Sequence, residues 1–282
     1  MMSLNAPLVA AAPFTSRTSS AAASTKLPLL SRVGKKGRAV MQRPASALRL
    51  CYIRSASDPF IVVDNGDDFT YGICQYISEL RLSFEVCRND GVTVDGLRRN
   101  NPRAMFISPG PGMPQDSGVS MKAIQELGPA IPIFGVCLGL QCIGEAFGGK
   151  IVSVPSDLAN NDTRKIYFNK EPDEMGLFDN FYRPFIVTQH DSRVIDKETF
   201  PHDTLEITAW TEDGLVMAAR HKKYNHIQGV NFIPECVVMD EGKRIVFSFI
   251  KFVEEMEGMA AKETRATRKL ANPWEDIDVE ED

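Results

Sequence analysis

One cysteine lies in a segment whose composition could support nucleophilic chemistry. Cys137 sits within Gly135-Val136-Cys137-Leu138-Gly139, directly after an apolar run and before a stretch with helical spacing. A nucleophile between glycines at a strand-to-helix turn is the pattern of a nucleophile elbow, here with cysteine in place of serine. The N-terminus of the following helix would stabilise a thiolate, the reactive form. A buried core cysteine fits the same pattern, and this segment alone does not decide between the two.

A glycine-rich loop follows another expected strand. Ser108-Pro109-Gly110-Pro111-Gly112 comes directly after the apolar run 104–107. The carboxyl ends of parallel strands meet at one edge of a sheet, so we expect this loop to lie near Cys137. Glycines let backbone N–H groups approach a substrate carbonyl closely, as an oxyanion hole requires. A plain Pro-Gly turn is the alternative.

The elements that must position these residues alternate between strand and helix. Short apolar runs predict buried strands at 60–63, 84–87, 104–108 and 131–136. Helices are expected at 70–82, from the N-caps Asp116 and Ser117 to 127, and from Cys137 to 147. The second half predicts strands at 205–210, 215–220 and 226–232, with Asp213-Gly214 as a hairpin turn, and a helix at 244–256. We therefore expect an α/β fold with a mostly parallel sheet, flanking helices and an antiparallel extension.

Composition excludes several classes of protein. The chain has 282 residues, of which 43% are hydrophobic and 24% charged, as in ordinary globular domains. Its net charge of −5 argues against nucleic-acid binding, and no run of 18 apolar residues predicts a membrane helix. The six cysteines show no CxxC spacing, so neither a zinc site nor a disulfide scaffold is expected. We expect no metal and no cofactor.

The two ends differ from the middle in charge. Residues 1–57 carry nine basic and no acidic side chains and are rich in Ala and Ser, which is typical of an organelle transit peptide. The remainder has a net charge of about −14, and 259–282 forms an acidic tail. We predict a disordered transit peptide at 1–57, one α/β domain at 58–258 and a tail at 259–282. Chloroplast is the first choice of compartment and mitochondrion the second; a basic tail without a targeting role is the alternative.

Several segments together resemble the class I glutamine amidotransferases, and among them the small (β) subunits of plant anthranilate synthase. The resemblance covers about residues 59–257. The segments that carry it are Asp64-Asn65, Phe69-Thr70-Tyr71, 107–112, 114–118, 134–149, 208–220 and 226–230. It implies the fold already expected from the strand and helix pattern.

The resemblance also implies roles for individual residues. In the family, a cysteine attacks the side-chain amide of glutamine and releases ammonia, which a larger α subunit uses to aminate chorismate. Cys137 matches this nucleophile. The residues that match the glutamine and oxyanion pocket are Gly110, Pro111, Gly112, Leu138, Gln141 and Ser192.

The catalytic triad departs from the family pattern. The family closes it with Phe-His-Pro-Glu-Ser, whereas this chain has Phe232-Ile233-Pro234-Glu235-Cys236. Glu235 matches the orienting acid, but Ile233 stands where the catalytic histidine belongs and cannot carry a proton. Asp191 is a second departure, in a pocket segment where a new carboxylate could repel the α-carboxylate of glutamine. Of the four histidines, His190 is the best candidate for a substitute base.

Three functions remain open from these residues. The first is the glutamine amidotransferase subunit of anthranilate synthase in tryptophan biosynthesis, catalytically impaired here. The second is an inactive paralogue that acts as a docking or regulatory subunit. The third is an amidotransferase component of aminodeoxychorismate synthase. In each case the expected partners are glutamine and a larger synthase subunit, with no nucleic acid and no membrane.

Overall fold

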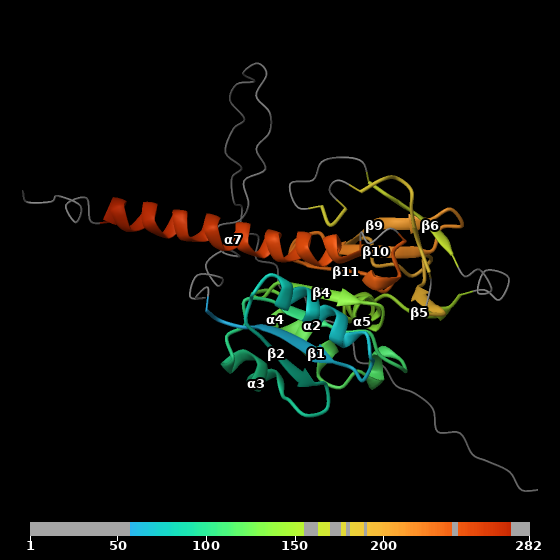
Figure 1. Cartoon of the computed structure of the whole chain (residues 1–282), viewed down its shortest axis with the longest axis horizontal. Helices are drawn as coiled ribbons and strands as arrows, with labels where there is room; N and C mark the ends of the chain where they lie inside the picture. The colour runs from blue at the N-terminus through green and yellow to red at the C-terminus, as the bar shows by residue number, and fades with distance from the viewer. Residues whose placement is uncertain are drawn as a thin grey trace, which may run out of the picture. The chain divides into compact units, whose positions relative to one another are not determined.

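The computed structural model describes residues 57–154, 163–169, 176–178, 181–188, 191–238 and 242–271. Apart from Ser57, the predicted transit peptide lies outside these residues, as do 272–282 of the predicted tail and His190. The described part of the chain forms a central sheet with helices packed on it (Figure 1). Within that part, no helix combines the length and hydropathy that a membrane crossing needs.

The central sheet has nine strands in the order β2-β1-β3-β4-β11-β10-β9-β6-β7. Its first half is parallel throughout. The strands of this half are β1 (Phe60–Asp64), β2 (Phe84–Arg88), β3 (Met105–Ile107), β4 (Ile133–Val136) and β11 (Ile227–Val230). Their positions confirm the predicted strands, and the apolar runs that predicted them are buried on both faces except in the edge strand β2.

The second half of the sheet is antiparallel, which confirms the predicted extension. Its strands are β6 (Arg164–Phe168), β7 (Phe185–Val187), β9 (Leu205–Thr211) and β10 (Val216–His221). β9 and β10 form the expected hairpin, in which Gly214 adopts a φ of +83° at the turn. Two further strands, β5 (Ile151–Ser153) and β8 (Arg193–Ile195), pair as a separate small sheet. The sequence analysis predicted β9 and β10 but not β5–β8.

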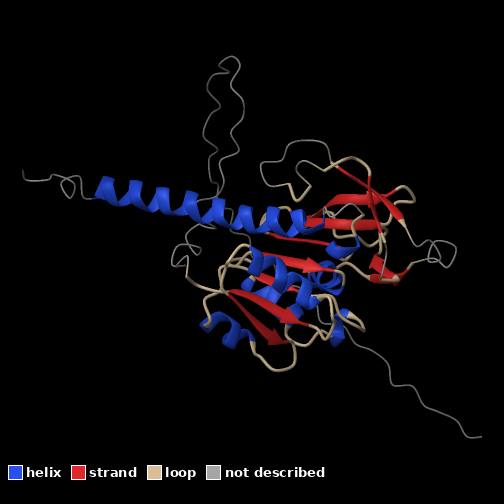
Figure 2. Ribbon diagram, viewed as in Figure 1, coloured by secondary structure: helices blue, strands red, loops and turns tan. Residues whose placement is uncertain are grey.

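Helices cover the sheet on both faces and create two apolar layers (Figure 2). The strand β1 shows the alternation: Phe60 and Val62 face one layer, and Ile61 and Val63 the other. The first layer is completed by α2 (Thr70–Glu79) and α7 (Gly242–Ala271). The second is completed by α3 (Val94–Arg99), α4 (Ser120–Leu127) and α5 (Leu138–Ala146). Both layers therefore pack against the parallel strands whose carboxyl ends carry the candidate site.

Aromatic contacts fix α7 to the centre of the sheet. The ring of Phe106 in β3 lies 5.4 Å from that of Phe249 in α7 and 5.9 Å from that of Phe134 in β4. Phe134 and Phe249 are themselves 5.1 Å apart. Edge-to-face and tilted pairs at such distances add to the burial energy of the rings. The strand that leads to Cys137 is thus held between its neighbours and α7.

Two helix boundaries differ from the predictions. Asp116 and Ser117 do not cap α4: Asp116 accepts a hydrogen bond from Met113 N at 3.0 Å in the 3₁₀ turn η2 (Pro114–Asp116), and Ser117 Oγ donates to Pro114 O at 2.6 Å. These local bonds compete with capping, and α4 begins at Ser120. The closing helix is longer than 244–256, because α7 continues to Ala271 and crosses the expected domain boundary at 258.

Candidate active site

Cys137 occupies a strained turn between β4 and α5. It has a φ of +50° and a ψ of −106°, a conformation that non-glycine residues rarely adopt. Its backbone N–H donates to Val230 O in β11 at 2.8 Å, and its carbonyl accepts from Gln141 N at 2.9 Å in the first turn of α5. The structure thus gives the predicted nucleophile elbow its backbone geometry.

The flanking glycines permit two close backbone approaches. A Cβ atom built on Gly135 would lie 2.5 Å from the carbonyl carbon of Gly139, and one built on Gly139 would overlap the carbonyl oxygen of Ile107 in β3. Either side chain would push α5 away from the sheet. The glycine spacing of the elbow is therefore a packing requirement that keeps Cys137 at the carboxyl edge of the sheet.

The glycine-rich loop after β3 is anchored by the buried side chain of Asn65. Asn65 Nδ2 donates to Ser108 O at 2.9 Å, and its backbone N donates to Ser108 Oγ at 2.9 Å. Its Oδ1 accepts from Asn89 Nδ2 and from Ser120 Oγ, both at 3.0 Å. Asn65 thus connects the ends of β1, β2 and β3 with the start of α4. The sequence analysis quoted this asparagine in a motif but assigned it no role.

The same loop reaches the first residue of α5. A Cβ atom on Gly110 would lie 2.5 Å from Asn65 Cβ and 2.9 Å from Leu138 Cδ2. Gly112 adopts a φ of +84°, so glycine suits both positions. The predicted oxyanion loop and Leu138 are therefore neighbours. We expected this of segments that follow parallel strands at one edge of the sheet.

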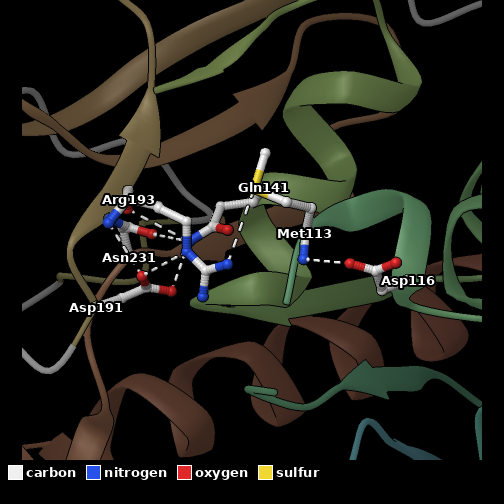
Figure 3. A network of polar contacts seen from close by, with 6 residues as sticks. All are labelled: Met113, Asp116, Gln141, Asp191, Arg193 and Asn231. Carbon is white, nitrogen blue, oxygen red and sulfur yellow. Dashed lines mark hydrogen bonds and ion pairs between the residues drawn. The ribbon is translucent and has the colours of Figure 1, made fainter. Parts of the chain in front are cut away.

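Gln141 lies one turn into α5 and is held by a network of polar contacts (Figure 3). Its Nε2 donates to Asp191 Oδ2 at 2.7 Å and, more weakly, to Arg193 O at 3.3 Å and Asn231 Oδ1 at 3.4 Å. Asn231 Nδ2 donates to Arg193 O at 2.9 Å. We call these four residues the Gln141 network. The sequence analysis missed Arg193 and Asn231, although Asn231 follows β11 at the same sheet edge as Cys137.

Asp191 sits at the centre of the Gln141 network. Its Oδ1 accepts from the backbone N of Arg193 at 3.0 Å and from Arg193 Nε at 3.2 Å. Arg193 Nη1 in turn points to Met113 Sδ at 3.8 Å, beside the glycine-rich loop. Ser192, the other predicted pocket residue here, is exposed, and its carbonyl accepts from Val154 N at 2.6 Å. The structure thus places the Asp191 carboxylate against Gln141 and leaves Ser192 at the surface.

The surroundings of Cys137 disfavour its thiolate. Cys137 is only 3% exposed, and this burial raises the pKa of its thiol well above the ordinary value. The negative charges of Asp191, Asp67 and Glu235 raise that pKa further, Asp191 the most. The helix N-terminus favours the thiolate, as expected, whereas burial and the neighbouring carboxylates oppose it.

The segment that completes the family triad lies beside this cysteine but supplies no base. Ile233 precedes the 3₁₀ turn η3 (Pro234–Cys236), is 2% exposed and belongs to the same apolar layer as Cys137. Glu235 is exposed as a residue, but its carboxyl group packs against Gly72 in α2. Burial raises the pKa of Glu235, and Asp67 raises it further.

The described histidines have structural roles. His221 Nδ1 accepts from the backbone N of Lys223 and Tyr224, both at 3.0 Å, and burial lowers its pKa. His226 Nε2 bonds Gly128 O at 2.8 Å, at the opposite end of β11 from Asn231. The ring of His202 packs against that of Phe200 at a tilt, with centroids 4.9 Å apart. These contacts give the three histidines of the described ranges packing and hydrogen-bonding roles.

The elbow, the glycine-rich loop and the Gln141 network belong to a domain with clear relatives. Residues 61–252 match the family model of class I glutamine amidotransferases. The chain belongs to the class I glutamine amidotransferase family. Anthranilate synthase beta subunit 1, chloroplastic, of Oryza sativa subsp. japonica is 57% identical over 205 residues, which are 73% of this chain and 71% of that protein.

A second relative and a solved structure are also similar to this amidotransferase. The corresponding Arabidopsis thaliana protein, also named chloroplastic, is 58% identical over 199 residues, 71% of this chain and 72% of its own length. In structure, the chain resembles a GMP synthase subunit from Thermoplasma acidophilum with a TM-score of 0.60, covering 71% of this chain and 96% of that one. At 21% identity, that likeness shows the fold alone.

Proposed function

We propose that this amidotransferase is the β subunit of an anthranilate synthase in which the docking fold is intact and the glutaminase centre is severely impaired. The observation that carries the impairment is Ile233, a buried apolar side chain where the family has its catalytic histidine. The assignment of the subunit rests on identities of 57% and 58% to proteins named anthranilate synthase beta subunits.

The chemistry of position 233 decides how large the impairment is. Isoleucine cannot take the proton of Cys137 or give one to departing ammonia, and Glu235 has no imidazole to orient. A positioned general acid–base group contributes about 10²–10⁴-fold, and loss of one member of a triad can cost roughly 10⁴-fold. Because burial and nearby carboxylates also raise the pKa of Cys137, the attacking thiolate is disfavoured when no base is present.

The family fold extends over most of the chain, which supports assembly with a larger subunit. The segments that match the family lie in both halves of the sheet and in the helices that cover it, from β1 to α7. The ammonia acceptor would be chorismate, held by the larger α subunit. We propose no cofactor for this chain's part of the reaction, because amide hydrolysis in the family uses a cysteine nucleophile, an acid–base pair and backbone donors.

The compartment proposed is the chloroplast stroma. Its support is the basic, acid-free segment 1–57 together with relatives that are named chloroplastic. Import of the full chain, fused to a fluorescent protein, into isolated chloroplasts and mitochondria would test it. Processing in chloroplasts alone is the expected result.

The decisive experiment compares nitrogen sources. The full chain, and a second preparation that begins at residue 58, are mixed with a plant anthranilate synthase α subunit and supplied with glutamine or ammonium. The α subunit alone and the Cys137→Ser variant are the blanks. We expect co-elution with the α subunit, ammonium-dependent anthranilate formation and glutamine-dependent formation near the blanks. A glutamine rate within about tenfold of an intact homologue would refute the impairment.

Two alternatives are separated by the same preparation. Ile233 also fits an inactive paralogue with a docking or regulatory role, and a change in the ammonium-dependent rate of the α subunit on binding would indicate regulation. Competition between α subunits of anthranilate synthase and aminodeoxychorismate synthase, in a pull-down with this chain as bait, tests the third function. Preference for the second partner would replace our assignment.

A further inference from the structure

We propose that Asp191 determines whether the pocket accepts glutamine. Its side chain lies in the glutamine pocket, bound to Gln141, and blocks glutamine binding independently of Ile233. This inference rests on the proposed function, because it concerns the same pocket. It goes further in predicting a defect in binding as well as in proton transfer.

The first step of the argument is the state of Gln141. This side chain is fully buried, and its strongest hydrogen bond goes to Asp191 at 2.7 Å. Because a carboxylate only accepts, Asp191 fixes the amide with its NH₂ group inward. The other amide atom, Gln141 Oε1, is buried without a hydrogen-bond partner among the described residues. The side chain expected to contact glutamine, Gln141, is therefore already hydrogen-bonded to Asp191. In this orientation its Oε1 acceptor has no partner among the described residues.

The second step is the charge inside the pocket. Asp191 lies 3.2 Å from Arg193, so the nearest guanidinium is neutralised by an internal carboxylate. Asp67, Asp191 and Glu235 all act on Cys137 as negative charges. An amino acid that presents its α-carboxylate to this region meets like charge, and like charges placed together disfavour binding strongly.

The third step is the link to the glycine-rich loop. Arg193 spans from Asp191 to Met113 Sδ, next to Gly112. Figure 3 shows Asp191 and Arg193 joined on one side of Gln141 and Met113 on the other. Removal of the Asp191 carboxylate would free the guanidinium and remove the shortest hydrogen bond of Gln141 Nε2, leaving it the weaker ones to Arg193 O and Asn231 Oδ1. The released guanidinium would then complement a substrate carboxylate instead of an internal one.

The test measures glutamine binding directly, by isothermal titration of the full chain. The variants are Asp191→Ala, which removes the carboxylate, Asp191→Asn, which keeps its shape without the charge, and Ile233→His. Asp213→Asn is the matched control, since Asp213 pairs with Arg164 at 3.0 Å in the β9–β10 hairpin turn, outside the Gln141 network. Thermal unfolding and co-elution with the α subunit report folding for each variant.

The expected result is no saturable glutamine binding for the unmodified chain, for Ile233→His or for Asp213→Asn. Asp191→Ala should bind glutamine saturably, at least roughly 10²-fold more tightly than the weakest affinity the titration detects, and further replacement of Arg193 by Gln in that variant should abolish the binding. Glutamine hydrolysis should return only when Ile233→His is combined with an Asp191 variant. If one Asp191 variant fails to fold, the other carries the test.

Two results would overturn the inference. One is binding of glutamine by the unmodified chain as tightly as by Asp191→Ala. The other is a folded, co-eluting Asp191 variant with no gain. If the unmodified chain binds glutamine but does not hydrolyse it, this inference fails while the proposed function stands. If the chain does not co-elute with the α subunit, the proposed function fails while the binding result still decides the role of Asp191.

Discussion

The carboxyl group of Glu235 lies against Gly72 at the start of α2, so closely that a Cβ atom on Gly72 would overlap Glu235 Oε1. In the family this glutamate is the acid that orients the catalytic histidine. Here Ile233 offers no ring nitrogen, and the carboxylate packs on a helix instead. Burial therefore makes ionisation of Glu235 cost stability in this chain.

Glu235→Gln should therefore stabilise the chain at neutral pH. Burial and Asp67 raise the pKa of Glu235 above its ordinary 4.5, so the folded state holds a proton that the unfolded state releases. Stability is lost as pH rises above the unfolded pKa, and the amide removes that loss. The stability gained by the variant should grow as pH rises above the ordinary pKa of 4.5, level off above the raised pKa of the folded state, and vanish under more acidic conditions. Urea unfolding across this pH range measures it.

Asp90→Asn provides a control of opposite sign. The Arg88 guanidinium lowers the pKa of Asp90, so the carboxylate stabilises the folded state above the unfolded pKa. At pH 7, Asp90→Asn should be less stable than the unmodified chain. This difference in stability should disappear as pH falls. A Glu235→Gln variant that also behaves this way would contradict our account of Glu235.

Alkylation of Cys137 should be slow at neutral pH. Its pKa is raised well above the ordinary value by burial and by carboxylates, so the thiolate fraction is small. Iodoacetamide labelling followed by peptide mass spectrometry should show Cys137 reacting far more slowly than Cys87, which is half-buried on the edge strand β2. The Cys137 rate should still be rising at pH 10. A rate that levels off near pH 7 would mean that an unrecognised group activates the thiol.

Much of the fold was predictable because its strands are marked by short apolar runs. The runs around Val62, Phe106 and Phe134 are buried on both faces, so their patterns survive in the sequence without alternation. The strand β6 was not predicted because Arg164–Phe168 shows neither an apolar run nor alternation, and β7 was missed although Phe185–Val187 is a short apolar run. α7 was predicted too short because its residues after Met256 are mostly polar or small.

The candidate site was predictable to the extent that its chemistry lies in contiguous motifs. Cys137, Gly110 and Gln141 were found because glycine spacing and the family resemblance point to them. The role of Asn65, which joins segments up to 55 residues apart, could not be read from local spacing. Nor could the bond between Asp191 and Gln141, which are 50 residues apart in the chain.

Two glycine substitutions should change stability in opposite directions. Gly139→Ala places a Cβ atom on the Ile107 carbonyl oxygen, and because backbone cannot move aside cheaply we expect a loss of about 1–3 kcal/mol. Gly258→Ala lies in α7 with open space around the added methyl, and should gain about 0.5–1 kcal/mol from helix propensity. Equal effects in urea unfolding would show that the elbow is less tightly packed than described.

Asn65→Ala should be among the more damaging single substitutions outside the apolar layers. It removes the partner of the Ser108 carbonyl and of the Asn89 and Ser120 side chains at once. Each buried polar group left unpaired costs about 1–3 kcal/mol, and water can reach only part of this cluster, so we expect a total loss of about 3 kcal/mol.

The exposed Asn100 provides the comparison for this substitution. Its Nδ2 donates to Glu85 at 3.0 Å on the surface, and Asn100→Ala should change stability by no more than about 0.5 kcal/mol. If Asn65→Ala costs as little, the glycine-rich loop is held mainly by its own turns. If it costs about 3 kcal/mol while co-elution with the α subunit persists, the hydrogen bonds of Asn65 position the loop against α5. The nucleophile elbow then keeps its supporting structure although the catalytic base is missing.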